Sequence, residues 1–408
     1  MTPRIAWVSP YLPEPAKSGG PIRQQNLARA LGRYAEVHLF AAADLLDRRR
    51  ARSQELDLFS TRWVGSGVLP NWISRRFTGI VLDETASRRV KSGSPAALFR
   101  AIHLSHRRVP FDALVVSHSW AALGARALGL PWVLDEHNIE SDFFRELAVS
   151  RGAPNESIDR EIPAMQQWER QVWRDATLLT CVSAEDAAAM ALFRPKEKLD
   201  QLPVRSPVVV ENGVDVVRFG LDPPPARAAG VLFIGAMHHG PNIEAALRLV
   251  TCIMPRVWSK LPELELCIVG GPVQRELARE AHRASGRVEL VGRVTETAPY
   301  LKTRRVFANP LMRGAGSSLK TLEALAAGIP LVSSACGARG YGLVPGVHYL
   351  AAETDEEFAQ KILHAVFASD ALVALTNAGQ KLAQSFNWTN LGARFASSVC
   401  EMIDQVKR

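Results

Sequence analysis

Short apolar segments alternate with amphipathic helical patterns along the whole of this 408-residue chain. Each apolar segment has the length and residue types of a buried strand, and the segments between them show the 3.6-residue spacing of helices. Strands separated by helices form βαβ units and therefore parallel sheets. The expected strands are 5–9, 37–41, 113–117, 132–135, 178–182, 208–211, 231–235, 264–270, 288–291, 306–309 and 329–333. The expected helices are 22–33, 157–174, 184–191, 243–258, 273–284, 317–327, 355–368, 371–384 and 389–404.

The strands and helices fall into two series on either side of a proline-rich stretch at 222–230. Consecutive prolines resist both helix and sheet, and a chain of this length exceeds the usual size of one hydrophobic core. We therefore expect two α/β domains of similar construction. No Gly-x-Gly-x-x-Gly follows the first strand, which argues against a dinucleotide-dependent oxidoreductase.

A small-residue turn follows the strand 306–309 and leads into a helix. Gly314 and Gly316 allow close approach of a ligand, and free amides at a helix start attract anions. Lys320 adds a cation, and Glu323 lies one turn further along the same helical face, where it can accept hydrogen bonds from sugar hydroxyls. These features suggest a nucleotide-diphosphate ligand. The alternative is an ordinary connection with a surface ion pair between Lys320 and Glu323.

The segment 314–332 resembles the nucleotide-sugar motif of retaining glycosyltransferases with the GT-B fold, particularly glycosyltransferase family 4. Asn-Gly-Val-Asp…Arg-Phe at 212–219 and Phe-Asn-Trp at 386–388 extend the resemblance over nearly the whole chain. It implies two Rossmann-like, doubly wound parallel-sheet domains that face a central cleft. Residues 1–220 would form an acceptor-binding domain, 221–385 would bind the nucleotide sugar, and a helix within 386–408 would cross back to the first domain.

The resemblance also implies roles for individual residues. The glycine-rich turn and lysine of the family hold the donor pyrophosphate, the glutamate binds the ribose, and further residues approach the base or close over the phosphate. The donor-binding positions implied here are Gly19, Gly20, Gly292, Arg293, Arg313, Gly314, Gly316, Ser317, Ser318, Leu319, Lys320 and Glu323. Many members carry a second glutamate, at the position of Ala315 in this chain.

The loop at 235–242 departs from the family pattern because it lacks the Arg and Lys that many relatives place there. His238 and His239 stand in this loop, and Asn242 is expected to be the N-cap of the next helix. Without fixed cations in the loop, Lys320, Arg313 and the helix amides must carry more of the diphosphate charge.

Two histidines in the first half follow adjacent expected strands: His118 comes after 113–117 and His137 after 132–135. Carboxyl ends of neighbouring parallel strands meet at the ligand-binding edge of a sheet, and imidazole suits acid–base work. The position of His118 matches the histidine that the family places at its active site. We expect both to be catalytic, and Asp135 or Glu136 to orient His118 or to bind acceptor hydroxyls; the alternative is that each is a satisfied structural histidine.

The formal charge of +8 is concentrated in the first 110 residues, which hold 18 Lys and Arg against 8 Asp and Glu. Basic clusters lie at 48–50, 72–77, 88–91 and 106–108. They suit an anionic membrane surface or a phosphorylated acceptor, or they form a solvated surface; no nucleic-acid motif accompanies them. Five scattered cysteines, no secretory signal and no membrane-spanning stretch predict a cytoplasmic protein, at most peripheral on the plasma membrane.

The sequence therefore predicts a retaining, metal-independent glycosyltransferase without a cofactor. It would transfer a sugar from a nucleotide-diphosphate sugar to a saccharide or lipid-linked saccharide, in surface or exopolysaccharide biosynthesis. No Asp-x-Asp metal motif is present in the chain. Two alternatives stay open: a nucleotide-sugar epimerase of the same fold, and a non-catalytic binding protein on that fold.

Overall fold

The computed structural model describes residues 2–13, 18–43, 62–65, 96–150, 152–194, 206–220, 230–314, 316–367 and 372–408. Three of the four basic clusters (48–50, 72–77 and 88–91) lie outside these residues, as do Ala315 and nearly all of the proline-rich stretch at 222–230. Within the described helices, none is both long enough and apolar enough to cross a bilayer.

The chain divides into two compact units. Unit 1 comprises Met1–Ala148, Gly152–Glu211 and Thr389–Arg408; unit 2 comprises Val149–Arg151 and Asn212–Trp388. The division lies after Glu211 and not after residue 220 as predicted. The reason is that the segment after Asn212 belongs to the second core: Val214 forms a parallel bridge with Asn387, and Phe219 is buried in unit 2.

Unit 1 is built on a seven-stranded parallel sheet with the order β3-β2-β1-β4-β5-β6-β7. The strands are β1 (Arg4–Ser9), β2 (Glu36–Ala43), β3 (Arg62–Gly65), β4 (Ala113–Ser117), β5 (Trp132–Asp135), β6 (Leu178–Cys181) and β7 (Val208–Val209). The strand order reverses between β1 and β4, which pair with each other. Ligands of doubly wound sheets bind outside the carboxyl ends of the strands at such a switch point.

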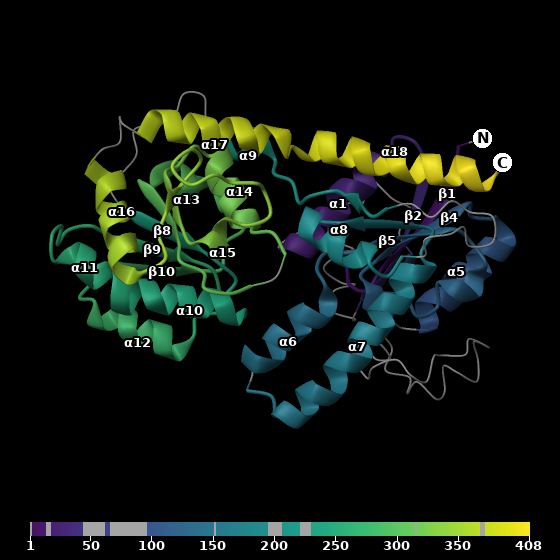
Figure 1. Cartoon of the computed structure of the whole chain (residues 1–408), viewed down its shortest axis with the longest axis horizontal. Helices are drawn as coiled ribbons and strands as arrows, with labels where there is room; N and C mark the ends of the chain where they lie inside the picture. The colour runs from purple at the N-terminus through teal and green to yellow at the C-terminus, as the bar shows by residue number, and fades with distance from the viewer. Residues whose placement is uncertain are drawn as a thin grey trace. The chain divides into compact units, whose positions relative to one another are not determined.

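Helices cover both faces of this sheet (Figure 1). They are α1 (Gly19–Leu31), α5 (Ala96–Arg108), α6 (Glu140–Ser150), α7 (Asn155–Asp175), α8 (Ala184–Ala191) and, from Thr389 onward, α18 (Trp388–Val406), with short 3₁₀ turns at Ser119–Ala121 and Arg126–Leu128. On one face of β1, Trp7 contacts Phe395 of α18, with ring centroids 5.7 Å apart. On the other face, Val8 lies in a core with Phe99 of α5 and Trp168 of α7. The central strands are therefore buried on both faces, as parallel sheets require.

Unit 2 contains a six-stranded parallel sheet with the order β10-β9-β8-β11-β12-β13, which reverses between β8 and β11. The strands are β8 (Val231–Ile234), β9 (Leu266–Val269), β10 (Val288–Gly292), β11 (Val306–Asn309), β12 (Leu331–Ser333) and β13 (Leu350–Ala351). The helices are α9 (Val216–Phe219), α10 (Gly240–Arg248), α11 (Met254–Trp258), α12 (Arg275–Arg283), α13 (Ala298–Thr303), α14 (Leu319–Ala326), α15 (Ala335–Ala338), α16 (Asp355–Phe367) and α17 (Val373–Ser385).

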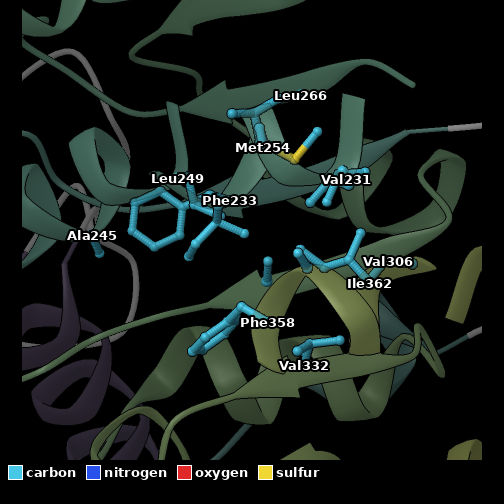
Figure 2. Packing of buried hydrophobic residues seen from close by; sticks show 14 of the residues in the cluster. Val231, Phe233, Ala245, Leu249, Met254, Leu266, Val306, Val332, Phe358 and Ile362 are labelled. Atoms are coloured by element: carbon cyan, nitrogen blue, oxygen red, sulfur yellow. The ribbon is translucent and has the colours of Figure 1, made fainter. Parts of the chain in front are cut away.

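One core of unit 2 lies between the sheet and the helices α10, α11 and α16. Figure 2 shows Phe358 and Ile362 of α16 beside Val306 of β11 and Val332 of β12, all four fully buried. Two apolar residues one helical turn apart thus face two neighbouring strands. Their burial fixes the helix against the sheet, since each side chain of this size contributes about 1.5–3 kcal/mol when removed from water.

The predicted fold class is confirmed: both units are doubly wound parallel-sheet domains. Each expected strand is present, and all but β4, β5 and β11 have shifted ends. The prediction missed β3 and β13, which are only four and two residues long, and the helices α5 and α6. The helix expected over 243–258 is helical throughout, but a π-helical segment at Leu249–Ile253 lies between α10 and α11. Apolar spacing alone does not distinguish a π turn from an α turn.

Candidate active site

The turn predicted to bind a diphosphate lies at the switch point of unit 2, between β11 and α14. Gly314 (φ 149°) and Gly316 (φ 68°) have positive φ, which glycine adopts without the cost of a Cβ. Leu319 and Lys320 begin α14, and the first N–H groups of a helix have no acceptor inside it. The turn therefore ends at a helix N-terminus, where negative charge is stabilised.

Residues from two other segments of unit 2 fix the shape of this turn. Asn212 Nδ2 donates a hydrogen bond to Ser317 Oγ at 2.9 Å, and Arg339 Nε donates to the carbonyl of Gly316 at 2.7 Å. Gly340 (φ 96°) lies so close that a Cβ built on it would stand 2.5 Å from the Cβ of Ser317. The segment after β12 thus supports the turn from the side.

Lys320 and Glu323 are both half-buried on α14. Lys320 Nζ donates to Asn242 Oδ1 at 2.5 Å and lies 4.7 Å from the centroid of the Phe233 ring. Burial lowers the pKa of Lys320 to about 7, although the Glu323 carboxylate opposes this. Burial raises the pKa of Glu323 to about 7, against the charges of Arg218 and Lys320. Lys320 thus bonds to Asn242, and no ion pair with Glu323 is found among the described residues; an anion beside Lys320 would favour its charged form.

The other predicted cation of this region is paired within unit 2. Arg313 Nε donates to Glu244 Oε2 at 2.9 Å, and its Nη2 also contacts the Glu244 carboxylate. Arg313 therefore has a protein carboxylate as partner in this structure, and a phosphate would have to compete with Glu244 for it.

The loop after β8 supplies a polar support and not a charge. The prediction that Asn242 is an N-cap is wrong, because α10 begins at Gly240 with His239 in the N-cap position. Asn242 instead links the loop to α14. Its Nδ2 donates a hydrogen bond to the carbonyl of Ala236 at 3.1 Å, and its Oδ1 accepts the hydrogen bond from Lys320 Nζ. Burial and the neighbouring Lys320 charge lower the pKa of His239 to about 4, so its imidazole is neutral at neutral pH.

Gly292 and Arg293, expected near the base, stand at the end of β10. This strand forms one edge of the sheet, and β9 separates it from β8. Gly292 has a φ of 77°, and its carbonyl accepts from Gly270 N at 2.7 Å, whereas Arg293 is exposed. Among the described residues, no hydrogen bond or ion pair joins either of them to the 314–320 turn.

His118 stands directly after β4, at the switch point of unit 1, and its ring is buried. Its φ of 70° is unusual for a residue with a Cβ, and such backbone strain costs about 1–3 kcal/mol and is concentrated at functional sites. Its N–H donates to the carbonyl of Asp135 at 3.0 Å, which ties it to β5. Nδ1 lies 2.5 Å from Glu140 Oε1, and Nε2 lies 2.8 Å from the hydroxyl of Tyr11.

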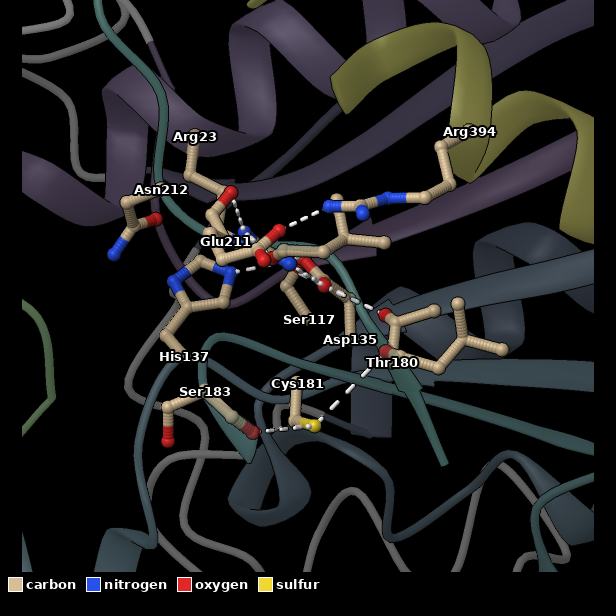
Figure 3. A network of polar contacts seen from close by, with 12 residues as sticks. Arg23, Ser117, Asp135, His137, Thr180, Cys181, Ser183, Glu211, Asn212 and Arg394 are labelled. Atoms are coloured by element: carbon tan, nitrogen blue, oxygen red, sulfur yellow. Dashed lines mark hydrogen bonds and ion pairs between the residues drawn. The ribbon is translucent and has the colours of Figure 1, made fainter. Parts of the chain in front are cut away.

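Asp135, the last residue of β5, is the centre of a second polar cluster (Figure 3). Its carboxylate accepts hydrogen bonds from Arg23 Nη2 at 2.6 Å and from the Thr180 hydroxyl at 2.7 Å. Its Oδ2 lies 3.1 Å from His137 Nε2. Arg23 also donates to the carbonyl of Val210 at 2.7 Å and has no exposed surface. Burial alone would raise the pKa of Asp135, but the charges and hydrogen bonds of Arg23 and His137 hold it well below its usual range.

Three buried glutamates surround the segment that carries His118. Glu136 accepts from Ser119 N at 3.0 Å and from Trp173 Nε1 at 3.0 Å, while Glu169 of α7 accepts from the backbone N–H of Glu140 at 2.6 Å. Burial, followed by the nearby Glu140 and Glu169 charges, raises the pKa of Glu136 well above its usual range. Burial and the Glu140 charge raise the pKa of Glu169 to about 8, although hydrogen bonds from Ser141 oppose this. At neutral pH these carboxyls therefore do not all carry charge.

Gly19 and Gly20 open α1 beside the two histidines. A Cβ built on Gly20 would stand 2.2 Å from the Tyr11 hydroxyl and 3.4 Å from His137 Nδ1. The N-cap residue Ser18 makes no side-chain capping bond. The glycine at position 20 thus leaves the Tyr11 hydroxyl, the His137 ring and the start of α1 close together.

In unit 1 the structure brings together His118, His137 and Gly20, whereas in unit 2 Gly292 and Arg293 lie on the edge strand β10 without a hydrogen bond or ion pair to the 314–320 turn among the described residues. The structure also adds partners that the sequence reasoning missed. The side chain of Asp135 pairs with His137, and Glu140, in place of the expected Asp135 or Glu136, pairs with His118. Tyr11, Arg23, Glu140 and Glu169 were not predicted. Of these, Arg23 had a signal: it precedes the buried Leu27 and Leu31 at helical spacing, so a charge falls on the apolar face of α1.

Two family models match this chain. The glycosyl transferase 4-like domain matches residues 18–205, and the glycosyl transferases group 1 domain matches residues 228–366. The chain is a GT-B glycosyltransferase that resembles family 4. The family predicted from the 314–332 motif is thereby confirmed. The second range contains both strands of the unit 2 switch point, β8 and β11, and the first contains β4 of the unit 1 switch point but begins after β1.

Curated relatives of this glycosyltransferase include a mannosyltransferase and a glycogen synthase. Phosphatidyl-myo-inositol mannosyltransferase of Mycolicibacterium smegmatis is 30% identical over 133 residues, which are 31% of this chain and 34% of that protein. Glycogen synthase of Mycobacterium tuberculosis is 25% identical over 239 residues, 57% of this chain and 54% of that protein. The chain thus spans about a third to about half the length of the curated relatives it matches.

Solved structures share the fold of the glycosyltransferase over nearly its whole length. Sucrose-phosphate synthase from Thermosynechococcus elongatus aligns with a TM-score of 0.74 at 15% identity, covering 98% of this chain and 99% of that one. HepE of Anabaena, in complex with UDP and glucose, aligns with a TM-score of 0.70 at 14% identity, again covering 98% and 99%. At these identities the likeness establishes the fold.

Proposed function

We propose that this glycosyltransferase moves a sugar, with retention and without a metal ion, from a nucleotide-diphosphate sugar to a saccharide or lipid-linked saccharide. The observation that carries the proposal is the 314–320 turn at the switch point of unit 2, with Lys320 and Glu323 on the helix that follows. The N-terminus of α14 and the Lys320 ammonium would stabilise charge that develops on the leaving diphosphate. Glu323 would accept hydrogen bonds from sugar hydroxyls.

The donor class is supported by the fold relatives. HepE of Anabaena has been solved in complexes with UDP and glucose and with UDP-glucose, and its fold matches this chain. In unit 1, the Tyr11 hydroxyl and the His118 and His137 imidazoles lie together at the carboxyl ends of the strands. Such polar groups suit the hydroxyls of a saccharide acceptor, so we assign acceptor binding to unit 1.

A role in surface or exopolysaccharide biosynthesis, at the cytoplasmic face of the membrane, completes the proposal. Its support is the basic charge of the first 110 residues. The cluster at 106–108 ends α5, where Arg107 and Arg108 are exposed. Sedimentation with vesicles containing anionic lipid tests this part: binding that vanishes at high salt supports it, and no binding at low salt overturns it.

The test of donor binding is a thermal-shift measurement with UDP, GDP, ADP and their sugars, each with and without EDTA. A ligand at a hundred times its dissociation constant stabilises the folded state by about 2.7 kcal/mol, which raises Tm by several degrees. We expect one nucleotide to stabilise the protein regardless of EDTA, and Lys320→Ala to remove the effect. Lys381→Ala, at an exposed position on α17, is the matched control.

Product analysis with the stabilising donor then identifies the reaction. Transfer to an added saccharide with the anomeric configuration kept supports the proposal. Isomerisation of the donor without an acceptor would make the protein an epimerase, and the absence of any nucleotide-dependent shift would make it a non-catalytic binding protein.

A further inference from the structure

Each of the two buried histidines of unit 1 has one ring nitrogen against a carboxylate. Asp135 Oδ2 lies 3.1 Å from His137 Nε2, and Glu140 Oε1 lies 2.5 Å from His118 Nδ1. An ionised carboxylate only accepts hydrogen bonds, so the nitrogen that faces it must carry the proton. The carboxylates therefore act on different nitrogens of the two rings.

For His137 the proton position follows from the charge of Asp135. Asp135 is ionised because Arg23 and the Thr180 hydroxyl both donate to it, and its pKa lies well below the usual range. His137 must then donate from Nε2. Its ring is neutral at neutral pH, because burial and the nearby His118 lower its pKa to about 3. Nδ1 of His137 is thus left as a lone-pair acceptor.

For His118 the proton position follows from the three glutamates around it. Burial and mutual repulsion raise the pKa of Glu136 and Glu169, and Glu140 is the one carboxyl of the three that contacts the ring, with its Oε1 2.5 Å from His118 Nδ1. In this arrangement Glu140 accepts a hydrogen bond from His118 Nδ1, and the proton stays on the ring. The pKa of Tyr11 is raised well above 10 by burial and by the nearby Glu140, so its hydroxyl stays protonated and can donate to His118 Nε2.

We propose that Glu140 and Asp135 are positioning residues that hold His118 and His137 in opposite neutral tautomers, Nδ1–H for His118 and Nε2–H for His137. His118 Nε2 and His137 Nδ1 are then both acceptors of hydrogen bonds. His137 Nδ1 is buried and has no hydrogen-bond partner among the described residues, and it lies beside Gly20, close to the Tyr11 hydroxyl. A buried lone pair of this kind suits the hydroxyl of an alcohol, which, on the function proposed above, is the acceptor saccharide.

The decisive measurement is the ¹⁵N spectrum of the full-length protein labelled at its histidine rings, at pH 7.5. The chain has ten histidines, and His118→Gln and His137→Gln variants identify the two of interest. Protonated and bare imidazole nitrogens resonate far apart, so we expect the Nδ1–H pattern for His118 and the Nε2–H pattern for His137. An Nε2–H pattern for His118, which would mean that Glu140 holds the proton, or two equivalent protonated nitrogens in either ring, overturns the proposal.

Two substitutions of Glu140 distinguish a positioning role from a role in folding. Glu140→Gln keeps an acceptor oxygen, so His118 is expected to stay Nδ1–H, whereas Glu140→Leu is expected to convert it to Nε2–H. Glu36→Gln is the matched control. Glu36 is exposed and pairs with His38 of the same unit, so this substitution should alter only the His38 ring. An unchanged His118 tautomer in Glu140→Leu overturns the role of Glu140.

The consequence for activity is read in the transfer assay. Glu140→Leu is expected to lower kcat at least tenfold with the KM for the donor within twofold, and Glu140→Gln to retain more of kcat than Glu140→Leu does. Equal losses in both variants would contradict the positioning role. If no transfer is found for the wild type, the proposed function fails, while the tautomers are still decided by the spectra.

Discussion

The imidazole rings of His118 and His137 lie 4.0 Å apart between centroids, inside unit 1, and different carboxylates hold them. Two buried rings this close repel each other strongly if both are protonated to the imidazolium form. Burial is the larger cause and His118 the next in lowering the pKa of His137 to about 3, from its usual 6.5. The neutral state of His137 is therefore linked to folding.

This linkage gives the first prediction, on stability in acid. Between pH 6.5 and 3 the unfolded chain binds a proton at His137 that the folded protein does not, so the free energy of unfolding falls as pH falls through this window. The slope from one such group is on the order of 1 kcal/mol per pH unit. Urea unfolding at pH 7 and pH 5 should show a smaller loss for His137→Gln than for the wild type.

The exposed His103 on α5 supplies the control, since His103→Gln should leave the loss between pH 7 and pH 5 unchanged. An identical pH dependence in His137→Gln and the wild type would contradict the prediction.

The second prediction concerns Glu169, whose linkage has the opposite sign. Its pKa is raised to about 8, chiefly by burial, so between pH 4.5 and 8 the folded protein holds a proton that the unfolded chain has lost. Stability contributed by this group is present at low pH and is lost as pH rises through the window. Glu169→Gln can still accept from Glu140 N but cannot ionise. The Tm of this variant relative to wild type should therefore be higher at pH 8.5 than at pH 5.5.

Glu156→Gln, at an exposed position near the start of the same helix α7, is the comparison. It should show no such pH-dependent gain. A Glu169→Gln variant whose Tm difference from wild type is the same at both pH values would mean that Glu169 titrates normally in the folded protein.

The strand pattern and the 314–320 turn could be predicted because both are local. Apolar runs and a glycine turn before a helix are visible within about twenty residues. The pairing of Glu140 with His118 and of Glu169 with the Glu140 backbone could not, because it joins residues 22 and 29 positions apart on different elements. Spacing along the chain gives no side-chain direction across a sheet edge, so the prediction named Asp135 or Glu136 instead.

The third prediction uses two glycines of one loop, Gly340 and Gly342, which both have positive φ. A Cβ on Gly340 would stand 2.5 Å from the Cβ of Ser317, whereas a Cβ on Gly342 has no atom within 4 Å. Both alanine variants carry backbone strain, of about 1–3 kcal/mol. Only Gly340→Ala should also displace the turn that we propose binds the diphosphate, so only this variant should lose nucleotide affinity, by at least tenfold in titration calorimetry.

Equal affinities in Gly340→Ala and Gly342→Ala, with both variants folded by circular dichroism, would show that the turn tolerates the displacement. Comparable losses in both would trace the effect to loop strain and not to contact with Ser317.

The last prediction concerns the proton on Lys320. In the ligand-free protein its pKa is about 7, so at pH 8 most molecules hold a neutral amine, while Glu323, also near 7, is mostly ionised. A diphosphate placed beside Lys320 favours the ammonium and raises its pKa. Binding at pH 8 should therefore take up a proton, and the affinity should fall as pH rises above 7. Titration calorimetry at pH 8 in phosphate and in Tris, whose ionisation enthalpies differ, measures the uptake directly with the nucleotide that gives the largest thermal shift. Lys320→Met should bind more weakly and take up no proton, whereas Lys381→Met should match the wild type. Equal heats in the two buffers for the wild type would mean that Lys320 is already charged before the ligand arrives.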